Sequence, residues 1–129
     1  MIKLIALLKR KPGLSREEFA RRWLEEHLRL STKMPGVRGY RVNIATNHQP
    51  DGDGVEPLYD GTAELWWDSV GAMEAAFASD AGKIAGADAD QFAEVRIHIY
   101  TEEHIVVPGP EKRAARRRAT PKRKTKRAR

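Results

Sequence analysis

Alternating hydrophobic and polar positions predict four β-strands in this chain. Residues 2–8 are apolar on both alternating faces, a pattern typical of a central strand that is covered on both sides. Alternation with a period of two residues predicts three more strands, over residues 37–46, 58–67 and 94–106. Residues 47–57 contain two prolines and two glycines, which predict a loop between the second and third strands.

Hydrophobic positions three or four residues apart predict two main helices. In the first, over residues 15–30, Phe19, Trp23 and His27 form one inward-facing stripe, and charged side chains occupy most of the opposite side. The second is predicted over residues 70–78 by the same periodicity.

Two glycines interrupt the helical pattern that follows residue 78. Residues 79–90 therefore predict one or two short helical turns, broken at Gly82 and Gly86. The resulting element order, β-α-β-β-α-β, predicts a ferredoxin-like α+β fold. In this fold both helices lie on one face of a four-stranded antiparallel sheet.

The face of the sheet opposite the helices needs a cover. It would carry half of the apolar side chains of the first strand, together with a polar set: Arg41, Asn43, Thr62, Glu64, Arg96 and His98. A second copy of the chain would cover this mixed face, so we expect a homodimer in which two sheets form an α+β barrel. On the same face, Glu64, Arg96 and His98 predict either a site near the dimer axis or a solvated charge cluster.

Charge divides the chain into two parts. Residues 1–108 contain 13 basic and 17 acidic residues, whereas residues 109–129 contain eleven basic residues and one acidic residue. We therefore expect a folded, mildly acidic domain followed by a disordered basic C-terminal tail. The tail either binds nucleic acid through phosphate contacts, without sequence preference, or only adds solubility. Its candidate nucleic-acid-binding residues are Arg116, Arg117, Arg118, Lys122, Arg123 and Lys124.

Composition also bears on where the protein works. The chain has no cysteine, which excludes disulfides and thiolate catalysis and fits a reducing compartment. It contains no apolar run of membrane-spanning length and no secretory signal pattern. We therefore expect a soluble cytoplasmic protein without membrane contact.

His27 is the strongest candidate for chemistry. It occupies a position where helical spacing calls for an apolar side chain, and its ordinary pKa near neutrality suits proton transfer. The same position also fits a core histidine that is bonded to a backbone carbonyl. The residues alone leave both interpretations open.

The larger apolar side chains between helices and sheet are candidate substrate-binding residues. They are Trp23, Tyr40, Leu65, Trp67 and Phe77. Together they fit either a pocket for a planar hydrophobic molecule or an ordinary core.

The sequence predicts neither a bound metal nor a cofactor. The four histidines, His27, His48, His98 and His104, include no pair at helical i, i+4 spacing. The acidic loop at Asp51 and Asp53 lacks the remaining ligand positions of a calcium loop. No glycine-rich phosphate loop follows a strand.

Short motifs in a fixed order run through the predicted domain, over roughly residues 1–106. They are Pro12-Gly13-Leu14-Ser15, Phe19, Trp23, His27, Pro35-Gly36-Val37, Tyr40, the segment 60–66, and Phe92. In order and spacing these motifs resemble EthD-type proteins. The resemblance implies a ferredoxin-like fold that pairs into a dimeric α+β barrel.

The resemblance also bears on function. EthD-like proteins include accessory proteins of ether-degrading oxygenase systems and muconolactone methyl-isomerases. Enzymes that modify aromatic polyketides occur on related barrels, and so does haem binding, which nothing in this sequence demands. A histidine at the place of His27 is a recurrent feature of the family, and in the isomerases it lies in the reaction pocket. The resemblance therefore implies a catalytic role for His27.

This chain departs from the isomerase pattern at two positions. The isomerases have a cysteine in the third strand, where this chain has Leu65. They also have a histidine in the preceding loop, where this chain reads Asp53-Gly54-Val55 and the nearest histidine is His48. These departures argue against the isomerase reaction itself.

Three functions remain as alternatives. The first is a cofactor-independent enzyme, of isomerase, lyase or oxidoreductase-associated type, which acts on a hydrophobic aromatic or lactone-type metabolite with His27 as acid/base. The second is a non-catalytic accessory protein of an oxidative catabolic pathway. The third is a nucleoid-associated module tethered by the basic tail. A solvent-reachable cavity at His27 would favour the first, and a cavity filled by Trp23 and Trp67 the second.

Overall fold

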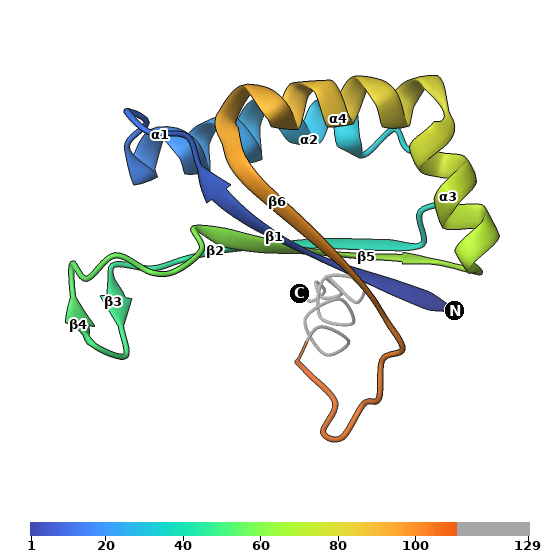
Figure 1. Cartoon of the computed structure of the whole chain (residues 1–129). Coiled ribbons are helices and arrows are strands. Elements are labelled where there is room, and N and C mark those ends of the chain that lie inside the picture. Colours follow the sequence, from blue (N-terminus) through green and yellow to red (C-terminus); the bar gives the residue numbers. More distant parts are fainter. Residues whose placement is uncertain (111–129) are drawn as a thin grey trace, which may run out of the picture.

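Four antiparallel strands form the main sheet of the computed structural model, which describes residues 1–110. They are β1 (Ile2–Arg10), β2 (Gly39–Ile44), β5 (Gly61–Trp67) and β6 (Ala93–Thr101). Their order across the sheet is β2-β5-β1-β6, and every neighbouring pair is antiparallel. The predicted ferredoxin-like α+β fold is confirmed, with β1 at the centre (Figure 1).

The first helix is continuous but changes its winding midway. It consists of α1 (Arg16–Arg21), the π-helical segment η1 (Arg22–His27) and α2 (Leu28–Ser31). Ser15 caps its start, because its hydroxyl oxygen accepts a hydrogen bond from the Glu18 N–H at 3.0 Å. At the end of η1 the N–H of Leu28 reaches the carbonyl of Trp23, five residues back. Such π-helical turns are frequent at functional sites.

The second helical region consists of α3 (Val70–Ala78) and α4 (Asp80–Phe92). The prediction of broken turns over residues 79–90 is wrong, because α4 is one regular helix of 13 residues. A Cβ at Gly82 would lie 2.2 Å from the carbonyl oxygen of Ala76. Gly82 therefore does not interrupt α4 but lets its first turn approach the end of α3.

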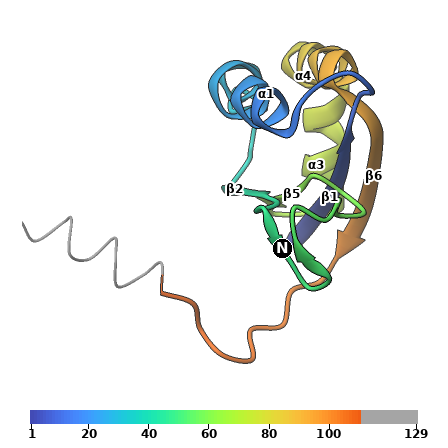
Figure 2. The ribbon, with the colours of Figure 1, turned by 90° about the vertical axis from the view of Figure 1, so that its left-hand side faces the viewer.

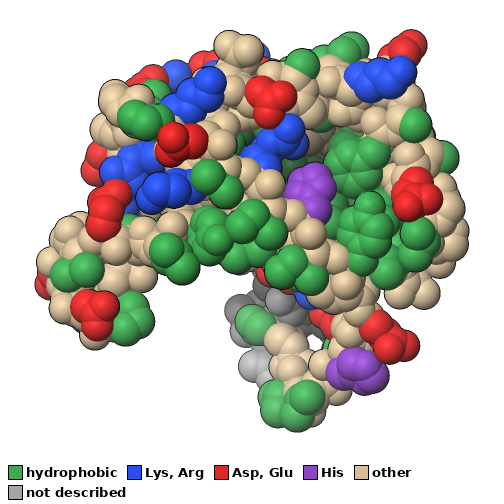
Figure 3. Space-filling model, viewed as in Figure 1, with side chains coloured by type: hydrophobic (Ala, Val, Ile, Leu, Met, Phe, Trp, Pro, Cys, Tyr) green, Lys and Arg blue, Asp and Glu red, His purple; other side chains and the backbone are tan. Residues whose placement is uncertain are grey.

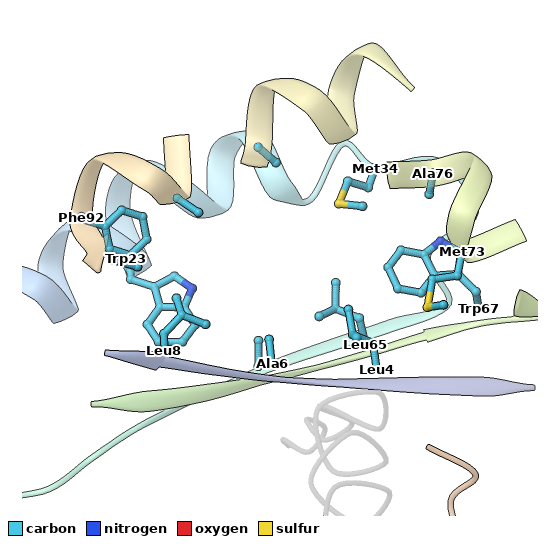
Figure 4. Packing of buried hydrophobic residues seen from close by; sticks show 14 of the residues in the cluster. Leu4, Ala6, Leu8, Trp23, Met34, Leu65, Trp67, Met73, Ala76 and Phe92 are labelled. Atoms are coloured by element: carbon cyan, nitrogen blue, oxygen red, sulfur yellow. The ribbon is translucent and has the colours of Figure 1, made fainter. Parts of the chain in front are cut away.

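All of these helices cover one face of the sheet, as the two perpendicular views show (Figures 1 and 2). The core fills the layer between them. In Figure 4, Trp23 and Phe92 lie at one end of this layer, and Trp67 and Met73 lie at the other. All four side chains are almost completely buried.

A short hairpin projects from the sheet between β2 and β5. It is formed by β3 (His48–Gln49) and β4 (Gly52–Asp53), which pair with each other and not with the main sheet. The views in Figures 1 and 2 show it extending away from the helix layer.

The strand register corrects one prediction about the faces of the sheet. His98 lies opposite Ala6, and Arg96 lies opposite Leu8. Because Ala6 and Leu8 are buried under the helices, Arg96 and His98 also belong to the helix-covered face. Glu64 lies on the other face, where its carboxylate pairs with Lys3 at 2.7 Å. The predicted group of Glu64, Arg96 and His98 is therefore not formed.

The open face of the sheet, opposite the helices, keeps partly exposed isoleucines. Ile97 and Ile99 of β6 are 38% and 47% exposed there. After β6 the described chain continues to residue 110 without regular structure. In the part of the chain that the structure describes, no helix is long and apolar enough to cross a membrane.

Candidate active site

A cavity of about 60 Å³ lies between the helix layer and the sheet. It has room for roughly four to six water molecules. Small residues in the centre of the layer leave this space: Ala6, Ala63, Ala85, Gly86 and Ala89. Aromatic side chains close it on the sides, and its polar wall consists of His27, Ser31, Tyr40, Arg96 and His98.

His27 reaches the cavity from the last position of η1. The residue is 7% exposed, and its ring packs 5.3 Å from the ring of Phe92, centre to centre. Its Nδ1 lies 2.8 Å from Oδ2 of Asp88, which comes from α4. The sequence left two interpretations of His27 open, and the structure gives the ring a carboxylate partner rather than a backbone carbonyl.

Asp88 is itself fixed by Arg22. The guanidinium of Arg22 donates two hydrogen bonds to the Asp88 carboxylate, at 2.8 and 3.1 Å. It also lies over the Phe92 ring, at 5.2 Å from the centroid. Such a forked pair fixes geometry as well as charge. Arg22, Asp88 and His27 thus form a connected network that joins the first helix to α4.

The surroundings of His27 and Asp88 lower the pKa values of both groups. Burial lowers the pKa of His27 below its ordinary value; the hydrogen bond to Asp88 opposes this, and the positive charges of Arg22 and Arg96 add to it. The hydrogen bond from Arg22 is the main reason that the pKa of Asp88 is also lowered. At neutral pH the pair is therefore an uncharged imidazole beside an ionised carboxylate.

This charge state determines which nitrogen of His27 carries the proton. Nδ1 must hold the hydrogen that it donates to the Asp88 carboxylate, so Nε2 is left as an unprotonated acceptor. Because Nδ1 is engaged and the ring lines the cavity, Nε2 is the nitrogen available to a molecule inside it. The hydrogen bond therefore holds the imidazole in one tautomer with a free acceptor nitrogen, which is what general-base chemistry requires.

A second polar pair lies in the same wall. The hydroxyl groups of Tyr40 and Ser31 are 2.8 Å apart. Burial raises the pKa of the Tyr40 phenol, although hydrogen bonds with Ser31 and Trp23 act in the opposite direction. Tyr40 therefore remains protonated and can donate a hydrogen bond.

His98 and Arg96 reach the cavity from the edge strand β6. The His98 ring packs 5.5 Å from the ring of Phe77. Partial burial of this ring, together with the charge of Arg96, lowers the pKa of His98. Much of the residue is still exposed, so the shift is limited by solvent screening.

The structure brings most of the candidate substrate-binding residues to one place. Trp23, Tyr40, Leu65 and Phe77 line the cavity with His27. Trp67 lies beside it, where its ring packs 5.7 Å from Phe77 and its indole N–H donates to the Pro35 carbonyl at 3.0 Å. Trp23 therefore forms part of the cavity wall, and neither Trp23 nor Trp67 fills the cavity.

Sequence reasoning missed Asp88, Arg22 and the inward side of His98. Asp88 lies 61 residues after His27, in a segment whose helix was predicted as broken. Arg22 and His27 are five residues apart, a spacing that shares a face only in a π-helical turn. An acidic residue among alanines in residues 85–89 is the one signal that the sequence offered.

The other predicted residues do not join this site. His48 pairs with Asp53 at 2.6 Å on the exposed hairpin. The candidate nucleic-acid-binding residues from Arg116 to Lys124 lie outside the described residues. Within residues 1–110, no group of three or more histidines and carboxylates could hold a metal ion.

Fold and site together define a ferredoxin-like α+β protein in which a buried histidine pairs with a part-buried aspartate at a small cavity. The chain belongs to the EthD domain family, whose model matches residues 11–96. A solved EthD family protein from Bacillus halodurans is 30% identical, with 81% of this chain and 99% of that chain covered and a TM-score of 0.68. The resemblance seen in the sequence is confirmed.

More distant solved structures share the fold alone. SnoaB, a cofactor-independent oxygenase from Streptomyces nogalater, is 12% identical, with 84% of this chain and 97% of that chain covered and a TM-score of 0.59. A dimeric protein with a ferredoxin-like fold from Bacteroides fragilis is 15% identical, with 79% and 95% covered and a TM-score of 0.59. A search of the curated proteins finds no match to this chain.

Proposed function

We propose that this chain is a cofactor-independent enzyme that moves a proton on a mainly apolar, aromatic or lactone-type metabolite. The observation that carries the proposal is the hydrogen bond between His27 and Asp88, which leaves Nε2 of a neutral imidazole facing a cavity. A buried histidine whose orientation is fixed by a carboxylate is a common arrangement for acid–base chemistry.

In the proposed step, Nε2 of His27 takes a proton from an acidic C–H or O–H group of the ligand. The resulting imidazolium is stabilised by the ionised carboxylate of Asp88, 2.8 Å from Nδ1. The proton then returns to another atom of the ligand in an isomerisation, or to a leaving group in an elimination. Tyr40 supplies a hydrogen bond from the cavity wall to a ligand oxygen.

The small size of the cavity favours a second candidate, a non-catalytic accessory protein. At about 60 Å³, the cavity is smaller than a bicyclic molecule needs. An enzyme that acts on such a ligand must therefore widen this cavity, whereas an accessory protein need not.

Proton exchange with solvent tests the enzymatic proposal without the natural substrate. Wild-type protein would be incubated in D₂O with a panel of aromatic ketones, phenols and unsaturated lactones, and deuterium uptake followed by NMR. We expect catalysed exchange on at least one compound, and a loss of roughly two to four orders of magnitude in His27→Asn. His104→Asn, on an exposed segment, is the matched control. Equal exchange rates in wild type and His27→Asn contradict the proposal.

A cavity-filling variant tests whether the ligand enters this space. A Cβ added at Gly86 meets nothing within 4 Å, and Gly86 lines the cavity. Gly86→Leu should fill it and abolish exchange while His27 and Asp88 remain in place. Ala87→Leu, at the neighbouring exposed position of α4, should leave exchange unchanged.

We further propose that the chain is a homodimer that pairs through the open face of the sheet. Ile97 and Ile99 are exposed there beside the buried strand β1, and a second copy would remove them from water. The Bacteroides fragilis protein of the same fold is described as dimeric, which supports this arrangement.

A further inference from the structure

Arg96 and His98 stand between the cavity and the solvent. Both line the internal cavity, and both also line a wider surface hollow of about 400 Å³ with Asp90, Ala93 and Glu94. Residues shared by an inner cavity and an outer hollow form the passage between them. In the space-filling view, hydrophobic side chains gather around a histidine and a basic side chain beneath the helix layer (Figure 3).

The charge of the cavity wall is one-sided. Arg96 is a permanent cation, and His27 and His98 are the other ionisable groups besides the phenol of Tyr40. Among the described residues that line the cavity, none is acidic. The carboxylate of Asp88 lies behind the His27 ring and is already neutralised by Arg22. The outer hollow carries the carboxylates of Asp90 and Glu94, so it is in the inner wall that an anion meets cationic and neutral donors and no carboxylate.

Both residues at the passage have hydrogen-bonding capacity left. Arg96 uses Nη2 to bind Asp90 at 2.8 Å, a partner whose side chain is 66% exposed. Its Nη1 and Nε remain for another acceptor. Within residues 1–110, no side-chain or backbone hydrogen bond is formed by the His98 ring, which packs in a tilted contact against the ring of Phe77.

We propose that Arg96 and His98 bind an acidic oxygen of the ligand, a phenolate, enolate or carboxylate, while the apolar body of the ligand extends toward His27. This inference rests on the proposed function, since it takes the His27 cavity as the ligand site, and it narrows the substrate class. It assigns to His98 a binding role, separate from the proton transfer of His27. An apolar molecule without an acidic oxygen would leave Nε and Nη1 of Arg96 without an acceptor from the ligand, and Asp90 would stay the partner of Nη2.

Two small probes of matched shape test this assignment by binding alone. Benzoate and benzamide differ chiefly in charge, and their binding would be followed by NMR through the ring signals of His98 and His27. We expect benzoate to bind about tenfold to a hundredfold more tightly, because a hydrogen bond to a charged group contributes about 1.5–3 kcal/mol. Benzoate binding should also weaken as salt concentration rises.

Variants at the passage give the decisive comparison. Arg96→Gln and His98→Gln should each weaken benzoate binding much more than benzamide binding, and so remove most of the preference for benzoate. Arg38→Gln is the matched control, because Arg38 forms an exposed pair with Asp68 at 2.7 Å away from the cavity. It should keep the wild-type preference.

Three outcomes would overturn the inference: equal binding of the two probes, no saturable binding of benzoate, or a preference that survives Arg96→Gln. These outcomes are distinguishable from failure of the proposed function. If His27→Asn leaves proton exchange intact but the benzoate preference still depends on Arg96, the enzyme proposal fails and the anion site stands. If proton exchange requires His27 but benzoate and benzamide bind equally, the enzyme proposal stands and the anion site fails.

Discussion

Asp88 on α4 accepts a hydrogen bond from Nδ1 of His27 on η1, across 61 residues of sequence and 2.8 Å of space. The contact does two things at once. It connects the two helical regions above the sheet, and it fixes which nitrogen of a cavity-lining imidazole can act as a base.

Replacing Asp88 tests its role as a positioning residue. In Asp88→Asn the imidazole loses the carboxylate that selects the Nδ1–H tautomer, so we expect proton exchange to fall by roughly 10²- to 10⁴-fold. The ¹⁵N NMR shifts of the His27 ring should change from one tautomer to a mixture, a readout that a purely structural role would not produce. Glu74→Gln, an exposed substitution on α3, is the control. An unchanged tautomer in Asp88→Asn would contradict this role.

The lowered pKa of His27 predicts how stability depends on pH. The unfolded chain binds a proton near the ordinary value of 6.5, whereas the folded chain resists protonation until a lower pH. The unfolded state therefore holds more protons in that interval, and the free energy of unfolding should fall as pH drops below about 6.5. His98 contributes with the same sign, and Asp88 adds a loss below 3.8.

Urea unfolding between pH 7.5 and 4.5 would measure this dependence. The slope around pH 6 should be shallower in His27→Asn, because one of the two responsible histidines is gone. His104→Asn, on the exposed segment after β6, should keep the wild-type slope. A stability that rises toward acid in the wild type would mean that the Asp88 charge outweighs burial at His27.

The buried hydroxyl pair predicts a coupling in stability. Tyr40→Phe removes the partner of the Ser31 hydroxyl at 2.8 Å, and Ser31→Ala leaves the Tyr40 phenol with its interaction to Trp23 alone. Each single substitution should cost about 1 kcal/mol of unfolding free energy. The double variant should cost less than the two single costs combined, which urea unfolding of all four proteins would establish. Strict additivity would show that the two hydroxyls act independently.

The proposed homodimer predicts that one of two similar surface substitutions weakens the dimer and that the other does not. Ile99→Glu places a charge on the open face of the sheet, and Ile84→Glu places one on the helix α4. The two isoleucines are 47% and 54% exposed, so burial alone does not distinguish them. Light scattering at micromolar concentration should give twice the chain mass for wild type and Ile84→Glu, and a shift toward one chain mass for Ile99→Glu. A monomeric wild type would contradict the barrel.

The basic tail is proposed to act independently of the domain. Removal of residues 109–129 should change the melting temperature little and abolish any retention on DNA, because eleven of the chain's basic residues leave with it. Retention by the full chain should fall steeply with salt, as neutralised phosphates release counterions. A loss of several degrees on truncation would show instead that the tail packs on the domain.

The sequence by itself determined the four main strands, the first helix and the helix over residues 70–78, in their order along the chain. Residues 2–8, apolar on both faces, predicted a central strand, and β1 is an interior strand of the sheet. The spacing of Phe19, Trp23 and His27 was enough to predict that His27 faces the sheet, because helical periodicity is a local property of the sequence. The break in charge near residue 108 likewise needs no structure to be seen.

Only the tertiary structure decided which side chains meet at the site. Alternation shows that Arg96 and His98 share a face, but it cannot say which one. We predicted this pair on the face opposite the helices, which is the wrong side. The register of β6 against Ala6 and Leu8 made that choice.

The local sequence pattern also could not predict that Asp88 is the partner of His27. Gly82 marks a helix break in sequence, yet it lets α4 run close to the end of α3 and carry Asp88 to His27. Contacts of this kind join residues that are far apart in the chain. They follow from how the helices pack on the sheet, and no local propensity encodes that packing.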